Sequence, residues 1–193
     1  MPPSPRIALF TRFPTPGAAK TRLIPAVGAQ GAARVHRRLV EQTIHTVRAS
    51  GVAFELRHTG AVAAAFADWL GDDVPLVEQG AGDLGDRLAR AAAPAILIGS
   101  DAPGLTPAHL RDAATALARA DAVIGPAADG GYWLLGIARP MPSLFVDMPW
   151  GTDRVAAETL HRLAAAGIDP IRLPVLDDCD RPEDLARWPD LVA

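Results

Sequence analysis

The sequence predicts an α/β sandwich with a mainly parallel sheet. Short apolar runs alternate with longer helix-like segments along the 193 residues, the order expected of strands joined by crossover helices. The runs at 7–10 and 95–98 are apolar throughout, as in strands covered by helices on both faces. Ligands of such sheets bind beyond the carboxyl ends of the strands, so residues that directly follow a strand matter most.

The first half of the chain contains three predicted strands. The strand at 7–10 follows a proline-rich start and precedes a loop at 14–17. A helix is expected from about 29 to 50, ending before Gly51, with an apolar stripe formed by Val35, Leu39 and Val47. The next predicted elements are a strand at 52–57, a helix at 62–70, a strand at 74–78 and a helix at 83–93 capped by Asp83.

The second half begins with the strand at 95–98, which is the strongest buried-strand signal. Thr106 followed by Pro107 is typical of a helix start, and this helix is expected to reach about residue 120. The remaining predicted elements are strands at 122–124 and 132–135, a helix from Thr152 to Gly167, a strand at 171–175 and a short helix opened by Asp180 and Pro182.

Length and composition predict a single domain over residues 1–193. A hydrophobic fraction of 49% with 21% charged residues excludes wholesale disorder. The sequence contains no apolar run of about 18 residues, and residues 1–6 lack the apolar core of a signal peptide. With one cysteine, the expected compartment is the cytoplasm. A net charge of −3 argues against a general nucleic-acid binder.

The first candidate site follows the first strand, at residues 16–23. Lys20 is the only lysine beside eighteen arginines. In an extended segment Lys20 and Arg22 would point to the same side, which suits a polyphosphate, and Gly17 permits a close turn. Ala19 stands where a Walker A loop requires glycine. The alternative interpretation is a surface loop with two solvated charges.

Three acidic segments also follow predicted strands. Asp101, after the most buried strand, is a candidate anchor for a nucleotide-bound magnesium ion, or a carboxylate that bonds its own turn. Asp129 precedes two glycines and the only tyrosine, a pattern that fits a ligand gap or a plain hairpin. Asp178 and Asp180 would share one face of an extended segment and could bind metal, although a capped helix start also explains Asp180.

A dinucleotide fingerprint competes with these candidates. Residues 80–85 read G-x-G-x-x-G after a predicted strand, and Asp101 lies at a suitable distance downstream. The unit comes third in the chain, polar residues enter it, and it leaves Lys20, Asp129 and Asp178 without a role. We therefore rank an NAD-dependent enzyme low.

Six ordered blocks together resemble the bacterial DUF2064 family, also labelled rSAM/selenodomain-associated transferase 1. They are Pro16–Leu23, Gln79–Arg87, Gly99–Thr106, Gly125–Tyr132, Trp150–Thr152 and Asp178–Leu185. Arg12 and Gly151 depart from the family's common lysine and serine. The resemblance implies the GT-A fold of nucleotide-diphospho-sugar transferases, a three-layer α/β/α sandwich. The first and last blocks are also similar to the phospholactate/phosphoenolpyruvate guanylyltransferases.

The resemblance implies a metal-dependent transferase that uses a nucleotide-activated donor and a small-molecule acceptor, with no nucleic-acid partner. Glycosyl transfer from a nucleotide-diphospho-sugar is favoured; the alternatives are nucleotidyl transfer from a nucleoside triphosphate to a small phosphorylated acid, and a non-catalytic nucleotide-binding protein. The predicted catalytic residues are Lys20, Arg22 and Asp129, with Mg²⁺ or Mn²⁺ bound by Asp101, Asp178 and Asp180. Nucleotide or substrate is expected to contact Arg12, Gly17, Lys20, Arg22, Gly82, Gly130, Gly131, Tyr132, Trp150 and Thr152. Trp133 is a further candidate for an aromatic acceptor wall.

Overall fold

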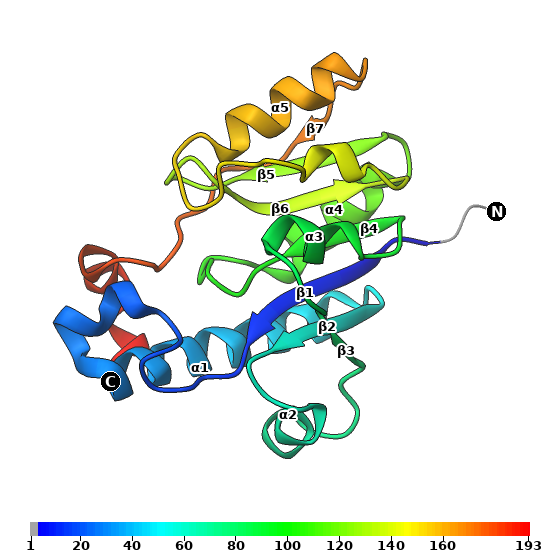
Figure 1. The fold of residues 1–193 in the computed structure, drawn as a ribbon. Helices are drawn as coiled ribbons and strands as arrows, with labels where there is room; N and C mark the ends of the chain where they lie inside the picture. Colours follow the sequence, from blue (N-terminus) through cyan, green and yellow to red (C-terminus); the bar gives the residue numbers. More distant parts are fainter. Residues whose placement is uncertain (1–3) are drawn as a thin grey trace.

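The computed structural model describes residues 4–193 and contains one seven-stranded sheet with the order β3-β2-β1-β4-β6-β5-β7 (Figure 1). The strands are β1 (Arg6–Arg12), β2 (Phe54–Thr59), β3 (Leu76–Glu78), β4 (Ala95–Ile98), β5 (Ala122–Pro126), β6 (Tyr132–Ile137) and β7 (Ile171–Arg172). Only β6 runs antiparallel to its neighbours, β4 and β5. The predicted α/β class with a mainly parallel sheet is confirmed; the first three residues of the proline-rich start lie outside the described chain.

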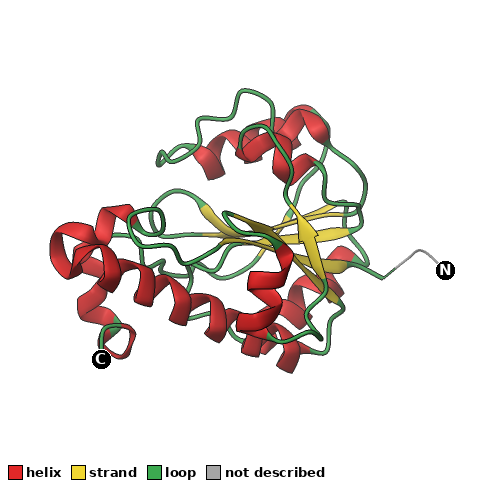
Figure 2. Ribbon diagram, turned by 60° about the horizontal axis from the view of Figure 1, so that its bottom comes forward, coloured by secondary structure: helices red, strands yellow, loops and turns green. Residues whose placement is uncertain are grey.

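Helices cover both faces of the sheet, which gives the three layers seen in Figure 2. The α-helices are α1 (Ile24–Ser50), α2 (Ala63–Leu70), α3 (Leu84–Ala89), α4 (Pro107–Leu117) and α5 (Val155–Ala165). Short 3₁₀ helices are η1 (Thr21–Leu23), η2 (Pro142–Leu144), η3 (Pro182–Arg187) and η4 (Pro189–Leu191). In the described range 4–193, no helix has both the length and the hydropathy needed to cross a membrane.

Alternating side chains of the central strands divide the core between the two layers. Ile7 and Leu9 of β1 pack with residues of α1 and α4, whereas Ala8 and Phe10 face α3, η2 and α5. A central strand with apolar residues on both faces must be buried on both sides, as the continuous apolar run predicted. This arrangement holds the carboxyl ends of β1 and β4 rigidly side by side.

A third apolar cluster joins the segment before α1 and the C-terminal segment to α1. Leu23 packs with residues of α1, and with Cys179 and Leu191 from the C-terminal segment. The red C-terminal segment lies beside the start of α1 and the blue loop before it in Figure 1. The segment around Lys20 and the segment around Asp180 are therefore neighbours, although they are 160 residues apart.

Three local predictions were wrong. Thr152 does not cap α5, because the loop continues to Arg154; the Thr152 hydroxyl donates to the carbonyl of Pro149 (2.8 Å) and accepts from the amide of Arg154 (3.3 Å). Lys20 and Arg22 are not extended: Lys20 has a left-handed backbone (φ 48°) and Arg22 lies in η1. The final helix is a 3₁₀ helix whose N-cap residue is Arg181 rather than Asp180.

Candidate active site

The candidate site lies where several strands end at one edge of the sheet. Arg12 ends β1, Asp101 follows β4 by three residues, and Gln79 follows β3. Because β6 is antiparallel to β4, its first residue, Tyr132, lies at the same edge. The fold thus brings together residues from most of the predicted segments, and it does so by sheet order rather than by proximity in sequence.

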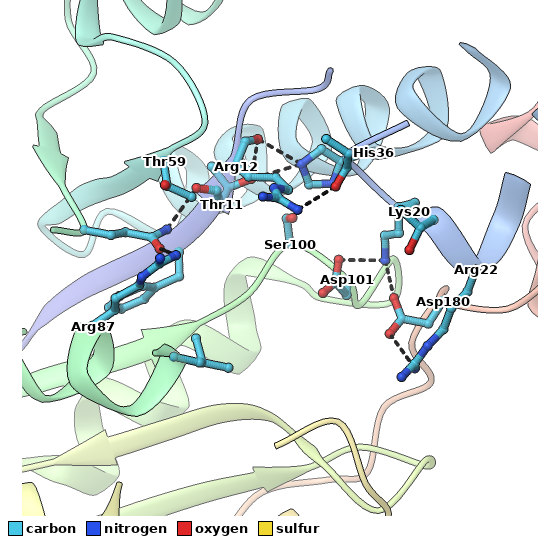
Figure 3. A pocket seen from close by; sticks show the side chains of 15 residues that line it. Thr11, Arg12, Lys20, Arg22, His36, Thr59, Arg87, Ser100, Asp101 and Asp180 are labelled. Atoms are coloured by element: carbon cyan, nitrogen blue, oxygen red, sulfur yellow. Dashed lines mark hydrogen bonds and ion pairs between the residues drawn. The ribbon is translucent and has the colours of Figure 1, made fainter. Parts of the chain in front are cut away.

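Lys20 is the centre of this edge. Its side chain is only 5% exposed, and its Nζ lies 2.7 Å from Asp101 Oδ1 and 2.5 Å from Asp180 Oδ1 (Figure 3). The same ammonium donates to the carbonyl of Cys179 at 2.7 Å. Burial alone would lower the pKa of Lys20, but the two carboxylates outweigh it and hold the pKa above its ordinary value. The amine is therefore a permanently charged group between two acids.

The two acids are held by backbone contacts as well as by the lysine. The amide of Cys179 donates to the carbonyl of Asp101 (2.8 Å), which fixes the C-terminal segment against the end of β4. Asp101 is half exposed; burial would raise its pKa, but the charge and hydrogen bond of Lys20 lower it overall. Arg22 adds a second positive charge 3.9 Å from Asp180. Both carboxylates are thus positioned before any ligand arrives, and Lys20 favours the ionised form of Asp101.

A cavity of about 440 Å³ opens beside Lys20, and we call it the cationic cavity. Its lining contains four positively charged side chains: Arg12, Lys20, Arg22 and Arg87. The remaining lining residues are Phe10, Thr11, Ala18, Thr21, His36, Thr59, Gln79, Leu84, Ser100, Asp101 and Asp180. Four cations and several hydroxyl groups at the ends of parallel strands suit a polyphosphate.

Several residues of the cationic cavity were not predicted. His36 projects from the middle of α1 into the cavity, and its Nε2 lies 2.9 Å from the carbonyl oxygen of Arg12. In the sequence it is a single histidine within a predicted helix, with no motif around it. Gln79 donates to the carbonyls of Thr11 (2.9 Å) and Arg57 (2.8 Å). Arg87 lies 3.5 Å from the side-chain oxygen of Gln79. Gln79 and Arg87 are the first and last residues of the block 79–87 that resembles the DUF2064 family. Their membership of that block was the only sequence feature that could have identified them as site residues.

A second cavity of about 280 Å³ adjoins the first, and we call it the aromatic cavity. Tyr132, Trp133 and Trp150 line it together with Thr152, Gly131 and Asp129. Its other lining residues are Phe10, Leu84, Leu88, Leu97, Ile98, Gly99, Asp101, Gly151 and Val155. The three aromatic side chains, from β6 and the loop before α5, thus line one cavity, and their contact with an acceptor stays a prediction.

A third, smaller cavity of about 130 Å³ connects the acidic residues, and we call it the carboxylate cavity. Asp101, Asp129, Asp178 and Asp180 all line it. Burial, followed by the charges of Asp129 and Asp180, raises the pKa of Asp178 to about 6. Asp101 belongs to the lining of all three cavities and marks their meeting point.

Residues 4–193 do not contain a preformed metal site. No group of three His, Cys, Asp or Glu side chains in that range is arranged to hold an ion. Instead, the Lys20 ammonium lies between two of the predicted ligands, Asp101 and Asp180. Asp178 is near them through the shared cavity. The metal assignment of these three acids stays a prediction.

Of the four glycines predicted to contact nucleotide or substrate, one lines the cavities described above and three do not. Gly131 lines the aromatic and carboxylate cavities, and its amide donates to Asp129 Oδ1 at 2.8 Å. Gly17, Gly82 and Gly130 do not belong to the lining of the three cavities. Gly130 has φ 90°, and a Cβ there would come within 2.2 Å of the carbonyl oxygen of Asp153. The space at Gly130 is thus used by the loop before α5.

The central part of the chain matches one known protein family. The family model described as "uncharacterized protein conserved in bacteria" (DUF2064) matches residues 42–152, more than half of the sequence. No curated protein matches the sequence significantly. The first and last predicted site segments, around Lys20 and Asp180, lie outside the matched range.

Solved structures resemble the chain over nearly its full length. A proposed nucleotide-diphospho-sugar transferase from Desulfovibrio desulfuricans is 28% identical, with a TM-score of 0.87 over 95% of this chain and 86% of that one. A Methanothermobacter nucleotidyl transferase is 22% identical, with a TM-score of 0.58 over 97% of both chains. Rv0371c of Mycobacterium tuberculosis, in a complex with manganese, is 20% identical, with a TM-score of 0.57 over 97% and 98%. The last two share the fold alone.

Proposed function

Because this chain belongs to the DUF2064 family and has the fold of nucleotide-dependent transferases, we propose that it transfers a group from a nucleotide-activated donor, with glycosyl transfer from a nucleotide-diphospho-sugar as the reaction. The observation that carries the proposal is the Lys20 ammonium, held 2.7 and 2.5 Å from two carboxylates in a cavity that also contains three arginines. The NAD alternative loses its support, because the glycine block at 80–85 leads into a helix of only six residues, α3, at the edge of this cavity.

The donor's diphosphate would bind in the cationic cavity. Lys20, Arg22, Arg12 and Arg87 would offset its negative charge, which increases on the leaving group as the bond to the sugar breaks. Electrostatic stabilisation of this kind contributes most where the donors are fixed before reaction. The pairing of Lys20 with Asp101 and Asp180 fixes it in this way.

The chemistry of the carboxylate cavity suits a divalent cation, although its acids are not grouped around one point while Lys20 pairs with two of them. Four carboxylates line one small cavity, and oxygen donors of this type are those that Mg²⁺ and Mn²⁺ prefer. Asp101 and Asp180 would hold the ion, with Asp178 beside them. When bound, such an ion supplies Lewis-acid neutralisation of the donor phosphates. The manganese complex of the similarly folded Rv0371c supports this part of the proposal.

Asp129 is the proposed general base. Its Oδ1 accepts from the amide of Gly131 at 2.8 Å, which orients the carboxylate at the boundary of the carboxylate and aromatic cavities. The acceptor hydroxyl oxygen would form a bond to the anomeric carbon, the bond from that carbon to the phosphate oxygen would break, and the electron pair would leave with the nucleoside diphosphate. The hydroxyl proton would pass to Asp129.

Nucleotidyl transfer is the second candidate, favoured by the Lys20 and Arg22 charges on either side of Asp180. In that reaction an acceptor phosphate oxygen attacks the α-phosphorus and pyrophosphate leaves. An ionised acceptor needs no base, so Asp129 would have no catalytic role.

Ligand-dependent thermal shift tests the proposal. The protein is heated with UDP-glucose, GDP-mannose, UTP or GTP, each with and without Mg²⁺ or Mn²⁺. Metal-dependent stabilisation by a nucleotide sugar but not by its triphosphate is expected, followed by release of nucleoside diphosphate. Stabilisation by triphosphates alone would favour nucleotidyl transfer, and nucleotide binding that metal does not tighten would favour a non-catalytic binding protein.

Asp101→Asn is the matched variant for this experiment. It removes a carboxylate that contacts Lys20 at 2.7 Å and lines all three cavities, so it should abolish the metal-dependent part of the shift. Asp112→Asn, on the exposed side of α4, is the control and should respond like the unmodified protein. An unchanged metal response in Asp101→Asn would remove this residue from the site.

A further inference from the structure

The aromatic cavity differs in charge from the cationic cavity next to it. None of its fifteen lining residues is Lys, Arg or His, whereas four cations line the neighbouring cavity. Its two charged residues are the acids Asp101 and Asp129. An anion in this space would meet carboxylates and aromatic faces without a compensating charge, which disfavours it.

The positive charges beside the aromatic cavity are already engaged by carboxylates. Arg22 Nη2 lies 3.8 Å from the point where a Cβ on Gly151 would stand, and the same side chain is 3.9 Å from Asp180. Asp101 is neutralised by Lys20. In the described part of the chain Asp129 has no ion pair, so the charge left in the aromatic cavity is negative.

Two hydrogen-bond donors of the cavity lining lack partners. Tyr132 Oη and Trp150 Nε1 are both buried, and neither has a hydrogen-bond partner among residues 4–193. Buried polar atoms are nearly always paired in folded proteins, so an unpaired donor needs an explanation. Both residues line the aromatic cavity, so a ligand oxygen that reaches these two enclosed atoms on binding would complete their bonding.

We propose that the aromatic cavity is the acceptor subsite and that it takes an uncharged or cationic small molecule with a hydroxyl or amine group and a flat apolar face, to the exclusion of phosphorylated and carboxylated acceptors. The role of this cavity as an acceptor subsite rests on the proposed function. Its preference for uncharged or cationic molecules rests only on the residues that line it. Aromatic side chains bind flat apolar faces and, through their π-electrons, cations. A hydroxyl oxygen of the ligand would accept from Tyr132 or Trp150, and the Asp129 carboxylate would accept from the hydroxyl or ammonium group of the ligand.

Four small probes of similar shape and different charge test the preference: benzyl alcohol, benzylamine, benzoate and phenyl phosphate. Binding is followed in ¹⁵N-labelled protein by the shift of the Trp150 indole signal, which the Trp150→Phe variant identifies. At equal concentration, benzyl alcohol and benzylamine are expected to shift this signal at least ~5-fold more than the two anions, because like charges repel across a dry contact. Equal or larger shifts with benzoate or phenyl phosphate would overturn the proposal.

Substitutions in the lining provide a second readout. Trp150→Phe removes one unpartnered donor and should weaken benzyl alcohol binding about 2- to 10-fold, the usual effect of losing one hydrogen bond; binding to this variant is followed by the indole signal of Trp133, which lines the same cavity. Trp69→Phe, on α2 and outside this cavity, is the control and should leave binding unchanged. If Trp150→Phe does not fold, Tyr132→Phe provides the same comparison. Thr152→Arg places a cation in the lining and should reverse the preference in favour of phenyl phosphate.

The donor experiment separates this proposal from the proposed function. If a nucleotide sugar stabilises the protein but the neutral probes leave the Trp150 signal unshifted, the acceptor proposal fails and the proposed function stands. If the probes bind as expected and no nucleotide stabilises the protein, the proposed function fails while the charge preference of the cavity stands.

Discussion

The cationic and aromatic cavities share one edge of the sheet and three lining residues, Phe10, Leu84 and Asp101, yet their chemistry is opposite. The cationic cavity is built from the ends of β1, β2 and β3, the loop and 3₁₀ helix before α1, the middle of α1, the helix α3 and the segments that contain Asp101 and Asp180. The aromatic cavity is built from β6 and the loop before α5. Charge is thus divided between the two halves of the edge: β1 and the segments beside it supply the cations, and β6 with the loop before α5 supplies the aromatic side chains. Two cavities of different charge meet at Asp101.

Among the substitutions considered, Lys20→Met should change activity the most, because it removes the central cation of the cationic cavity. It leaves Asp101 and Asp180 facing each other without the buried amine, so donor-dependent activity should fall by about 10²- to 10³-fold. The free energy of unfolding should fall by about 2 kcal/mol, less than for a fully buried pair because solvent reaches both acids. Urea unfolding and nucleotide release measure the two effects.

Lys20→Arg is the control for the charge. It keeps the cation but not the compact ammonium, so it should recover stability better than activity. Full activity in Lys20→Met would show that the cationic cavity does not depend on its central residue.

Gly130→Ala should damage the aromatic cavity selectively. The new Cβ would come within 2.2 Å of the Asp153 carbonyl at φ 90°, so the loop carrying Trp150 and Thr152 must shift, at a cost of about 2 kcal/mol. Donor binding in the cationic cavity should persist. Thermal unfolding and the benzyl alcohol titration are the measurements.

Gly17→Ala is the matched control, because Gly17 also has a positive φ (80°) but no atom lies within 4 Å of its Cβ position. It carries backbone strain alone and should cost about 1 kcal/mol without affecting the benzyl alcohol titration. Equal effects of the two substitutions would contradict the assigned role of the Asp153 contact.

Lowering the pH should disturb the cationic cavity and spare the aromatic cavity, whose lining contains no histidine. Burial lowers the pKa of His36, outweighing the favourable contact with the Arg12 carbonyl. The unfolded chain therefore binds this proton more readily, and stability falls as the pH drops below the ordinary histidine pKa, by at most about 1.4 kcal/mol per pH unit. Unfolding at pH 7 and pH 5 should show a smaller loss in His36→Gln than in the unmodified protein; an identical loss would exclude His36.

Tyr132→Phe should have the smallest effect on the ligand-free protein. Its Oη has no partner, so its removal should raise the free energy of unfolding by about 0.5 kcal/mol or leave it unchanged, whereas probe binding should weaken. A loss of more than about 1 kcal/mol would show that the hydroxyl is already satisfied in the ligand-free protein.

Local sequence signals were sufficient for much of the fold. The continuous apolar run at 95–98 coincides with β4, and the Thr106–Pro107 pair does begin α4, with Thr106 accepting from the amide of His109. Asp83 caps α3 as expected. These features depend on a few neighbouring residues, whose preferences the surrounding structure does not override.

The site was less predictable, because its parts meet through long-range packing. Arg87 and His36 enter the cationic cavity only because β2 and β3 lie beside β1 and α1 crosses the carboxyl end of β1. Lys20 reaches Asp101 and Asp180 through a left-handed residue and a 3₁₀ turn, not through the expected extended chain. Sequence reasoning selected Lys20, Asp101 and Asp180, which the fold does bring into contact, but it gave the wrong local geometry for Lys20.

The contact of Lys20 with Asp180 also sets an order of events during synthesis. A nascent chain can form β1 to β6 while residues 178–191 are still inside the ribosome, but its buried amine then lacks one carboxylate, the Cys179 carbonyl and the Leu191 packing. Competence to hold a donor would therefore arise only when residues 178–191 emerge and dock on α1.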